Sequence, residues 1–163
     1  MPSVLFVCTA NICRSPIAMG LFEKMFNDER VESYSGHQSW IVDSAGTWAK
    51  PGRLVHENSR QVSGQRGIDI EAHRSQPVSA ELLEAFDLTL TMEQGHKEAL
   101  RIEFPQVAKR IFVITEMAGY DYDIPDPIGH PVDEYEMVYR DLERLLTAGR
   151  ERIEQLVGIR SGS

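Results

Sequence analysis

The chain has 163 residues, a length that suits one domain with one hydrophobic core. Its net charge of −8 argues against nucleic acid or an anionic membrane surface as the main partner. Hydrophobic residues make up 42% and charged residues 26%, values that are typical of soluble globular proteins. We therefore expect a single domain over residues 1–163.

The chain has only two cysteines, Cys8 and Cys13. Two thiols form no disulfide framework and are too few for a metal cluster, so we expect neither a metal nor another cofactor. Free thiols fit a reducing compartment, and the first apolar run is too short for a signal peptide or a membrane span, so we expect a cytoplasmic protein. Their closeness permits a reversible Cys8–Cys13 disulfide that would shield Cys8 from over-oxidation.

The N-terminal stretch predicts a strand, a tight loop and a helix start. Residues 4–7 are apolar and rich in β-formers, which indicates a buried strand of a parallel sheet. Ser15 is a favoured N-cap residue, and Pro16 fits the first helical position because it has no N–H to leave unpaired. Such a loop presents backbone N–H groups and a helix dipole, so it suits a phosphate-sized anion.

Cys8 and Arg14 make this loop more than an anion site, because they form a Cys-x5-Arg pattern. Backbone donors, a helix N-terminus and a guanidinium favour the thiolate, which is the nucleophilic form of cysteine. Arg14 can bind two oxygens of one phosphoryl group in a planar fork. The loop therefore combines a nucleophile with an oxyanion clamp.

The rest of the chain alternates between helical and strand patterns. In order, we expect a helix over 15–30, a strand over 40–45, a helix over 56–66 ending at Gly67, a short helix capped by Ser79, a strand over 85–92, a helix over 93–104, a strand over 110–114, a long helix over 134–159 and a frayed tail over 160–163. This alternation predicts an α/β fold: a three-layer αβα domain with a four-stranded parallel sheet and right-handed crossovers. Ligands of such folds bind at the carboxyl ends of the strands, where Cys8 lies.

A phosphocysteine mechanism also needs a group that donates and then accepts a proton. The best candidate is Asp126, because the flanking Pro125 and Pro127 restrict the backbone and could hold its side chain over the site. The loop that carries Asp126 follows the fourth expected strand, so it also lies at the carboxyl edge of the sheet. Asp121 and Asp123 are rival acids, but solvated loop charges are the simpler interpretation of both.

Three segments resemble the low-molecular-weight protein tyrosine phosphatases: residues 7–16, residues 42–47 and Asp126-Pro127 before the last helix. The resemblance covers nearly the whole chain, and its first motif is highly specific. It implies the phosphatase I-like fold, a four-stranded parallel sheet flanked by helices, and chemistry without a metal.

The resemblance implies four catalytic residues. Cys8 would be the nucleophile and Arg14 the clamp for the phosphate and the transition state. Ser15 would hydrogen-bond the thiolate and help Cys8 to leave. Asp126 would act as general acid and then as general base.

The same resemblance implies how the substrate is held. Backbone N–H groups of residues 9–14, that is Thr9, Ala10, Asn11, Ile12, Cys13 and Arg14, would cradle the phosphate. Asn11 would hold the loop in an unusual conformation, braced by Ser44 and His73. Ile12 and Trp48 would be walls of the slot for an aromatic ring.

The chain departs from the family pattern in three places. Ala10 stands where the family usually has Gly, which predicts a slightly stiffer loop. Residues 128–130, Ile-Gly-His, replace a pair of tyrosines, so one aromatic wall is missing. Gln76-Pro77 replaces a more usual Arg-Gln pair after His73.

We therefore expect a protein tyrosine phosphatase that acts as a monomer on a phosphotyrosine-containing protein or peptide and releases inorganic phosphate. Protein arginine phosphatases are the first alternative; they share the loop and a Gly soon after Asp-Pro, but they typically carry Thr at the position of Ile12. Arsenate reductases need resolving cysteines outside the loop, and this chain has none. A non-catalytic phosphopeptide-binding module would need neither the thiol nor the acid.

Overall fold

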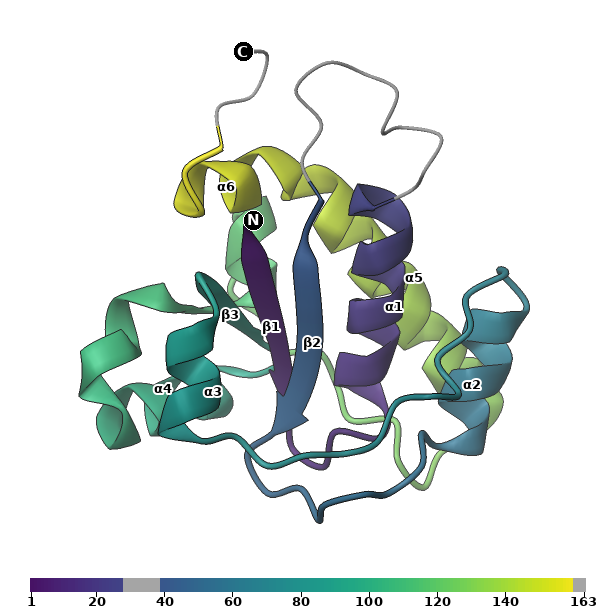
Figure 1. The fold of residues 1–163 in the computed structure, drawn as a ribbon. Helices are drawn as coiled ribbons and strands as arrows, with labels where there is room; N and C mark the ends of the chain where they lie inside the picture. Colours follow the sequence, from purple (N-terminus) through teal and green to yellow (C-terminus); the bar gives the residue numbers. More distant parts are fainter. Residues whose placement is uncertain (28–38, 160–163) are drawn as a thin grey trace.

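A computed structural model describes residues 1–27 and 39–159 of the protein. Four parallel strands form one sheet in the order β2-β1-β3-β4, with helices on both faces (Figure 1). The elements are β1 (Ser3–Cys8), α1 (Arg14–Phe26), β2 (Ile41–Gly46), α2 (Glu57–Gly64), α3 (Ala80–Ala85), β3 (Leu88–Thr91), α4 (Gln94–Glu103), η1 (Pro105–Arg110), β4 (Ile111–Val113), η2 (Ile114–Ala118), α5 (Val132–Ala148) and α6 (Arg150–Leu156). The predicted α/β class with a four-stranded parallel sheet is confirmed.

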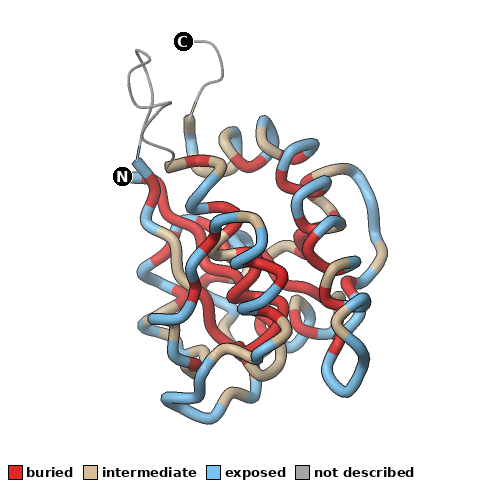
Figure 2. The backbone as a smooth tube through the Cα atoms, turned by 90° about the vertical axis from the view of Figure 1, so that its right-hand side faces the viewer, coloured by how far each residue is buried: buried red, intermediate tan, exposed pale blue. Residues whose placement is uncertain are grey.

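Strand β1 is buried on both faces because helices cover each side of the sheet. Val4 and Phe6 pack into the core beneath α1 and α5, whereas Leu5 and Val7 pack into a second core beneath α3 and α4. This is the two-residue alternation of a strand, with an apolar side chain on each side. Figure 2 shows the buried residues running through the centre of the molecule.

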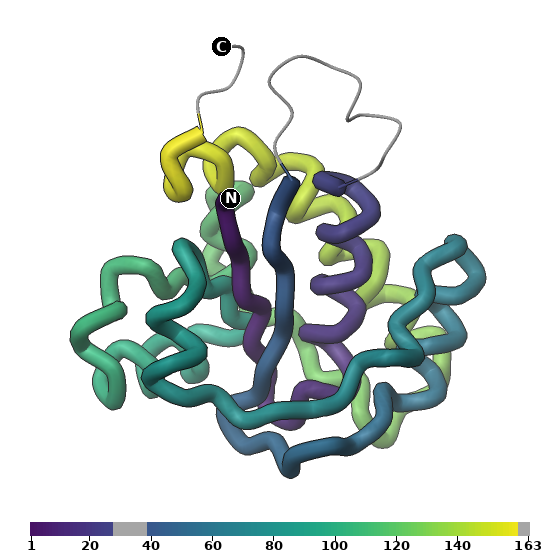
Figure 3. Tube along the Cα trace, viewed as in Figure 1, coloured from purple at the N-terminus to yellow at the C-terminus, as the bar shows by residue number. Residues whose placement is uncertain are grey.

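The parallel register brings the functional loops to one edge of the sheet. Cys8 pairs with Gly46 and Val7 pairs with Thr91, so three strands end at the same level. Figures 1 and 3 show the loops after β1 and β2 and the segment before α5 together at this lower edge, opposite α6. We expected Cys8 and the loop that carries Asp126 to meet at one edge of the sheet, and they do.

Helix α1 begins at Arg14 with Cys13 as its N-cap residue, so the prediction of Ser15 as N-cap and Pro16 as first residue is wrong. Pro16 is the third helical residue, where an N–H would also have no intrahelical partner, so the helix tolerates it. The Ser15 hydroxyl is used inside the loop instead. The helix ends at Phe26, and the predicted extension to Arg30 lies outside the described residues.

The long C-terminal helix is broken at Gly149 into α5 and α6, which corrects the continuous helix expected over 134–159. A Cβ atom at Gly149 would lie 2.6 Å from the Cβ of Met117 and 2.8 Å from the Leu145 carbonyl oxygen. The close approach of η2 therefore requires glycine here. The tail over 160–163 lies outside the described residues.

The short helix capped by Ser79 is confirmed, since its Oγ accepts a hydrogen bond from Leu82 N at 3.1 Å. Within residues 1–27 and 39–159, no helix is long and apolar enough to cross a membrane. In the same part of the chain, no group of three or more His, Cys, Asp or Glu side chains has an arrangement suited to a metal ion.

Candidate active site

The loop after β1 is built around Asn11, which has a φ of +60° and is fully buried. Its Nδ2 donates to Ser15 Oγ at 2.8 Å and to Ser44 Oγ at 2.9 Å, and its Oδ1 accepts from Gln76 N at 3.0 Å. A non-glycine residue in the left-handed region is strained, and these bonds over-determine it. No other non-glycine residue of the described chain has a positive φ, so Ala10 fits this loop without left-handed strain.

Five carbonyl groups of the loop are anchored to the surrounding scaffold. The carbonyls of Cys8, Thr9, Asn11, Ile12 and Cys13 accept hydrogen bonds from Thr47 N, Trp48 N, His73 Nε2, His56 N and Ser59 Oγ, respectively, at 2.8–3.2 Å. In a trans peptide the N–H points opposite to the C=O. The backbone N–H groups that follow these carbonyls therefore point away from the scaffold.

His73 is thus placed on Asn11, as the resemblance implies, through its backbone carbonyl. Burial lowers the pKa of His73, so its ring is neutral at neutral pH. Gln76 is a further brace that sequence reasoning missed, because its Nε2 also donates to Asp43 Oδ2 and to the Ser44 carbonyl, each at 3.0 Å. Gln76, which belongs to the pair that departs from the family pattern, therefore braces the loop itself.

Cys8 is 2% exposed, and its Sγ lies 3.0 Å from Ser15 Oγ. The Ser15 oxygen accepts from Asn11 Nδ2, so the Ser15 hydroxyl hydrogen can be donated to the sulfur or to the Ala45 carbonyl, which is more distant at 3.5 Å. Hydrogen bonds therefore connect Asn11 to Ser15 and Ser15 to Cys8. The helix dipole of α1 adds positive potential at the same place.

Arg14 is 1% exposed, and protein oxygens hold one side of its guanidinium. Its Nη1 donates to Glu93 Oε2 at 2.6 Å and to the Ile124 carbonyl at 2.7 Å. Its Nη2 lies 3.4 Å from Thr9 Oγ1 and 3.8 Å from Asp126 Oδ2. Its buried Nε has no hydrogen-bond partner in the described structure, so this cationic donor is left unpaired.

The side chain of Asp126 is 43% exposed and lies at the entrance to the loop. Its Oδ1 accepts from Ile128 N at 3.1 Å, while Oδ2 faces Arg14. The two rival acids are placed differently: Asp121 is exposed, and Asp123 Oδ1 accepts from Gln94 N at 2.8 Å at the start of α4. Asp126 is therefore the carboxylate of this segment that meets the Arg14 guanidinium.

Glu93 and His96 are site residues that sequence reasoning missed. Glu93 holds Arg14, and His96 Nε2 lies 2.9 Å from Thr9 Oγ1. Both follow β3, whose carboxyl end lies beside that of β1. The signal in the sequence was their position just after an expected strand, where polar residues of such folds line the ligand site.

Ile12 and Trp48 differ in their exposure. Ile12 is 6% exposed and packs with the core beneath α1, so only a small part of its side chain reaches the surface. Trp48 is 84% exposed on the loop after β2, and its backbone is tied to Thr9. The indole is the aromatic surface that the fold places at this edge.

Cys13 points into the core, where its Sγ lies 3.7 Å from the Tyr135 hydroxyl. Burial raises the pKa of the Cys13 thiol to about 11, so this thiol stays protonated at neutral pH. The backbone carbonyl of Cys13 is one of the anchored groups. The reversible disulfide with Cys8 stays a prediction.

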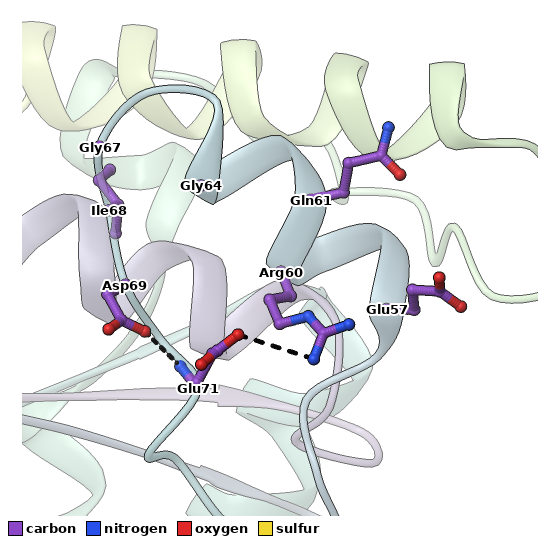
Figure 4. Close-up of a pocket in the computed structure, with 8 residues that line it drawn as sticks. All are labelled: Glu57, Arg60, Gln61, Gly64, Gly67, Ile68, Asp69 and Glu71. Atoms are coloured by element: carbon purple, nitrogen blue, oxygen red, sulfur yellow. Dashed lines mark hydrogen bonds and ion pairs between the residues drawn. The ribbon is translucent and has the colours of Figure 1, made fainter.

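Two hollows of the surface are lined by residues outside the loop that follows β1. One, of about 610 Å³, lies between α2 and residues 67–71, where Figure 4 shows Arg60 and Glu71 pointing toward one another, 3.7 Å apart. The other, of about 710 Å³, lies between α5 and the segment that carries Asp126. Asp126 lines this second hollow, so it stands between that hollow and the loop.

Comparisons with known proteins agree with this geometry. The family model described as low molecular weight phosphotyrosine protein phosphatase matches residues 3–156. A protein-arginine-phosphatase of Geobacillus stearothermophilus is 32% identical over 152 residues, which cover 93% of this chain and 95% of that protein. A low molecular weight protein-tyrosine-phosphatase of Salmonella typhi, Wzb, is 32% identical over 141 residues, which cover 86% of this chain and 87% of that protein.

The fold is also similar to solved structures. The crystal structure of a low molecular weight protein tyrosine phosphatase from T. tengcongensis matches with a TM-score of 0.84 at 34% identity, covering 93% of this chain and 99% of that one. Three findings support one family assignment: a family model that matches nearly the whole chain, relatives above 30% identity, and a shared fold. The chain belongs to the low molecular weight phosphotyrosine protein phosphatase family.

Proposed function

We propose that this protein is a phosphatase that hydrolyses phosphotyrosine in proteins or peptides through a phosphocysteine intermediate. The observation that carries the proposal is the Arg14 guanidinium, which is 1% exposed and has an Nε donor without a protein partner. A buried donor without an acceptor costs about 1–3 kcal/mol. A phosphoryl oxygen at this edge would supply the missing acceptor.

The backbone supports the same assignment. Because five loop carbonyls are tied to the scaffold, the N–H groups of Thr9, Ala10, Ile12, Cys13 and Arg14 face the opposite side. Converging backbone N–H groups at a helix N-terminus form a site for a phosphate-sized anion. These groups and Arg14 then hold the three non-bridging oxygens above Cys8.

In the first step the Cys8 thiolate attacks phosphorus, and the bond from phosphorus to the phenolic oxygen breaks. Asp126 donates its proton to that leaving oxygen. The Ser15 hydroxyl donates a hydrogen bond to the thiolate before the attack, since its own oxygen is already occupied by Asn11. Arg14 and the backbone donors stabilise the charge on the phosphoryl oxygens.

In the second step a water molecule attacks the phosphocysteine, and Asp126, now a carboxylate, takes a proton from that water. The phosphorus–sulfur bond breaks, and Cys8 leaves as a thiolate that Ser15 again stabilises. Inorganic phosphate is the product. We also propose that the protein works as a monomer in the cytoplasm.

The surroundings of the loop favour an aromatic ring as the leaving group. The exposed Trp48 offers a stacking face, and Ile12 offers an apolar edge rather than a polar group. Phosphoarginine is the second candidate, because the relative named protein-arginine-phosphatase is as similar, at 32% identity, as the tyrosine phosphatase Wzb. A guanidinium leaving group would gain from a hydroxyl at position 12, which Ile12 lacks.

The deciding experiment compares turnover of one peptide carrying phosphotyrosine or phosphoarginine by the wild type and by Ile12→Thr. We expect the wild type to prefer phosphotyrosine, and Ile12→Thr to shift the ratio of the two kcat/KM values toward phosphoarginine by about tenfold, equivalent to one hydrogen bond. Release of inorganic phosphate measures both reactions. A wild-type preference for phosphoarginine would overturn the substrate assignment.

Cys8→Ser is the matched control, because it removes the nucleophile and keeps the loop. It should abolish turnover of both peptides while still binding inorganic phosphate in a calorimetric titration. Turnover by Cys8→Ser at the wild-type rate would exclude the phosphocysteine mechanism altogether.

A further inference from the structure

A polar cluster at the edge of the loop contains two groups that the mechanism above does not use, the Thr9 hydroxyl and the His96 ring. We call Thr9, Arg14, Glu93 and His96 the Thr9 cluster. Its bonds join Thr9 Oγ1 to His96 Nε2 at 2.9 Å and to Arg14 Nη2 at 3.4 Å, and join Arg14 Nη1 to Glu93 Oε2 at 2.6 Å. The cluster links α4 to the loop after β1.

His96 is 8% exposed, and burial lowers its pKa, so the ring is neutral and carries one hydrogen. Four surrounding charges also affect the pKa of the ring: those of Glu93, Asp123 and Asp126 raise it, whereas that of Arg14 lowers it further. Glu93 Oε2 lies 3.6 Å from Nε2, whereas Nδ1 has no partner. The carboxylate therefore favours the hydrogen on Nε2, because a hydrogen on Nδ1 would be buried without an acceptor.

The tautomer of His96 determines what the Thr9 hydroxyl does. With its hydrogen on Nε2, His96 donates to Thr9 Oγ1, and Arg14 Nη2 donates to the same oxygen. Both acceptor positions of that oxygen are then filled, so the hydroxyl must donate its own hydrogen elsewhere. The oxygen lies against Arg14 Nη2, on the side of the guanidinium that is not held by Glu93 and the Ile124 carbonyl.

We propose that His96 is a positioning residue that turns the Thr9 hydroxyl into a hydrogen-bond donor to a phosphoryl oxygen. Thr9 then adds one side-chain donor to the backbone donors and the Arg14 edge. This proposal rests on the proposed function, since it deepens the description of the same anion site. The Thr9 hydroxyl and the His96 ring that orients it then contribute to the selectivity of the site for oxyanions.

Three substitutions of His96 separate its hydrogen bond from its bulk. His96→Gln can place an amide N–H near the Nε2 position, His96→Asn reaches only the Nδ1 position, and His96→Leu removes all polarity. We expect His96→Asn and His96→Leu to lower kcat/KM for an aryl phosphate by about tenfold and to weaken the binding of inorganic phosphate by a similar factor. His96→Gln should restore both quantities to within about threefold of the wild type.

A double-mutant cycle tests whether His96 acts through Thr9. Thr9→Val should cause the same tenfold loss, and adding His96→Leu to Thr9→Val should cause no further loss. Lys97→Met is the control on the same helix, because it removes the ion pair with Glu116 without touching the loop. It should change the melting temperature but leave kcat/KM at the wild-type value.

The outcomes are distinct from those for the proposed function. Wild-type kcat/KM and phosphate affinity in His96→Leu, losses in the double variant equal to the product of the two single losses, or equal losses in His96→Gln and His96→Asn would each overturn the proposal. If the wild type hydrolysed no aryl phosphate, the proposed function would fail. The calorimetric titration with inorganic phosphate would still test His96 in that case.

Discussion

At the scale of single residues, Asn11 shows how one side chain holds a functional loop. Its backbone is in the left-handed region, and its amide bonds to Ser15, Ser44 and the backbone of Gln76. The Ser15 bond continues to Cys8, so the shape of the loop and the hydrogen bond to the sulfur depend on the same amide. Losing it should therefore affect stability and chemistry together.

Replacing Asn11 by Gly or Ala separates the contribution of its amide hydrogen bonds from the strain of its left-handed backbone. Both variants lose the amide, which leaves buried polar partners unsatisfied at a cost of about 1–3 kcal/mol in the free energy of unfolding. Asn11→Ala should lose about 1–2 kcal/mol more than Asn11→Gly, because alanine is strained at a positive φ. Urea unfolding measures this difference, and equal stabilities would contradict a strained backbone at this position.

Asp126 is the second residue whose role can be tested alone. A proton donor matters most when the leaving group is a poor one, because a stable phenolate departs without help. Asp126→Asn should lower kcat for phenyl phosphate by about a hundredfold but lower it much less for an activated nitrophenyl phosphate. Steady-state assays over a series of phenols measure this slope. An equal loss for every phenol would assign the proton transfer to another group.

At the scale of elements, the C-terminal helix shows how packing overrides an amphipathic pattern. Apolar side chains that recur at helical spacing are buried along both helices: Tyr135, Val138, Leu142, Leu145, Leu146 and Ile153. The helix nevertheless breaks at Gly149, where the backbone meets Met117 of η2. The spacing of apolar residues carries no information about this close contact between elements that are distant in the sequence.

Gly149→Ala should destabilise the protein, because its Cβ would lie 2.6 Å from the Cβ of Met117. We expect a loss of about 1–3 kcal/mol in the free energy of unfolding, the usual cost of overpacking. Gly64→Ala is the matched control at the end of α2, where a Cβ would contact nothing within 4 Å. It should be neutral or stabilise by up to about 1 kcal/mol. Equal effects of the two substitutions would show that α6 moves freely away from η2.

At the scale of the whole molecule, we expect the half-buried His73 and the buried His96 to make the stability depend on pH. Burial lowers the pKa values of His73 and His96 in the folded state, below the ordinary value of 6.5. Between the folded and the unfolded pKa values the unfolded chain binds more protons, so the free energy of unfolding rises with pH there. The stability from the neutral rings is complete above about pH 6.5 and is lost as the pH falls through that value.

His73→Gln tests this linkage because its amide can still donate to the Asn11 carbonyl without titrating. Urea unfolding at pH 7.5 and pH 5.5 should show a smaller drop in stability for His73→Gln than for the wild type. A matched double variant, His73→Gln with His96→Gln, should flatten the dependence further. An unchanged drop in both variants would attribute the acid sensitivity to the carboxylates.

Much of the fold was predictable because it depends on local patterns. The apolar run of β1, the helical spacing after Ser15 and the alternation of elements all reflect burial, so they predicted a parallel sheet with Cys8 at its carboxyl edge. Capping was less predictable: Ser79 caps its helix, whereas Ser15 does not cap α1. The hydroxyl of Ser15 lies within reach of both Asn11 and Cys8, and only the folded loop brings them together.

The family, the reactive loop and the class of fold could be predicted from the sequence, because they depend on residues that are close together in the chain or on their periodicity. The groups that surround that loop are known only from the folded chain. Glu93, Gln76 and His96 reach it from segments far along the chain. A position after a strand made Glu93 and His96 candidates, but it does not tell which polar side chains turn toward the loop and which stay in solvent. Their partners are set by the order and register of the strands, which place the ends of β1, β2 and β3 side by side.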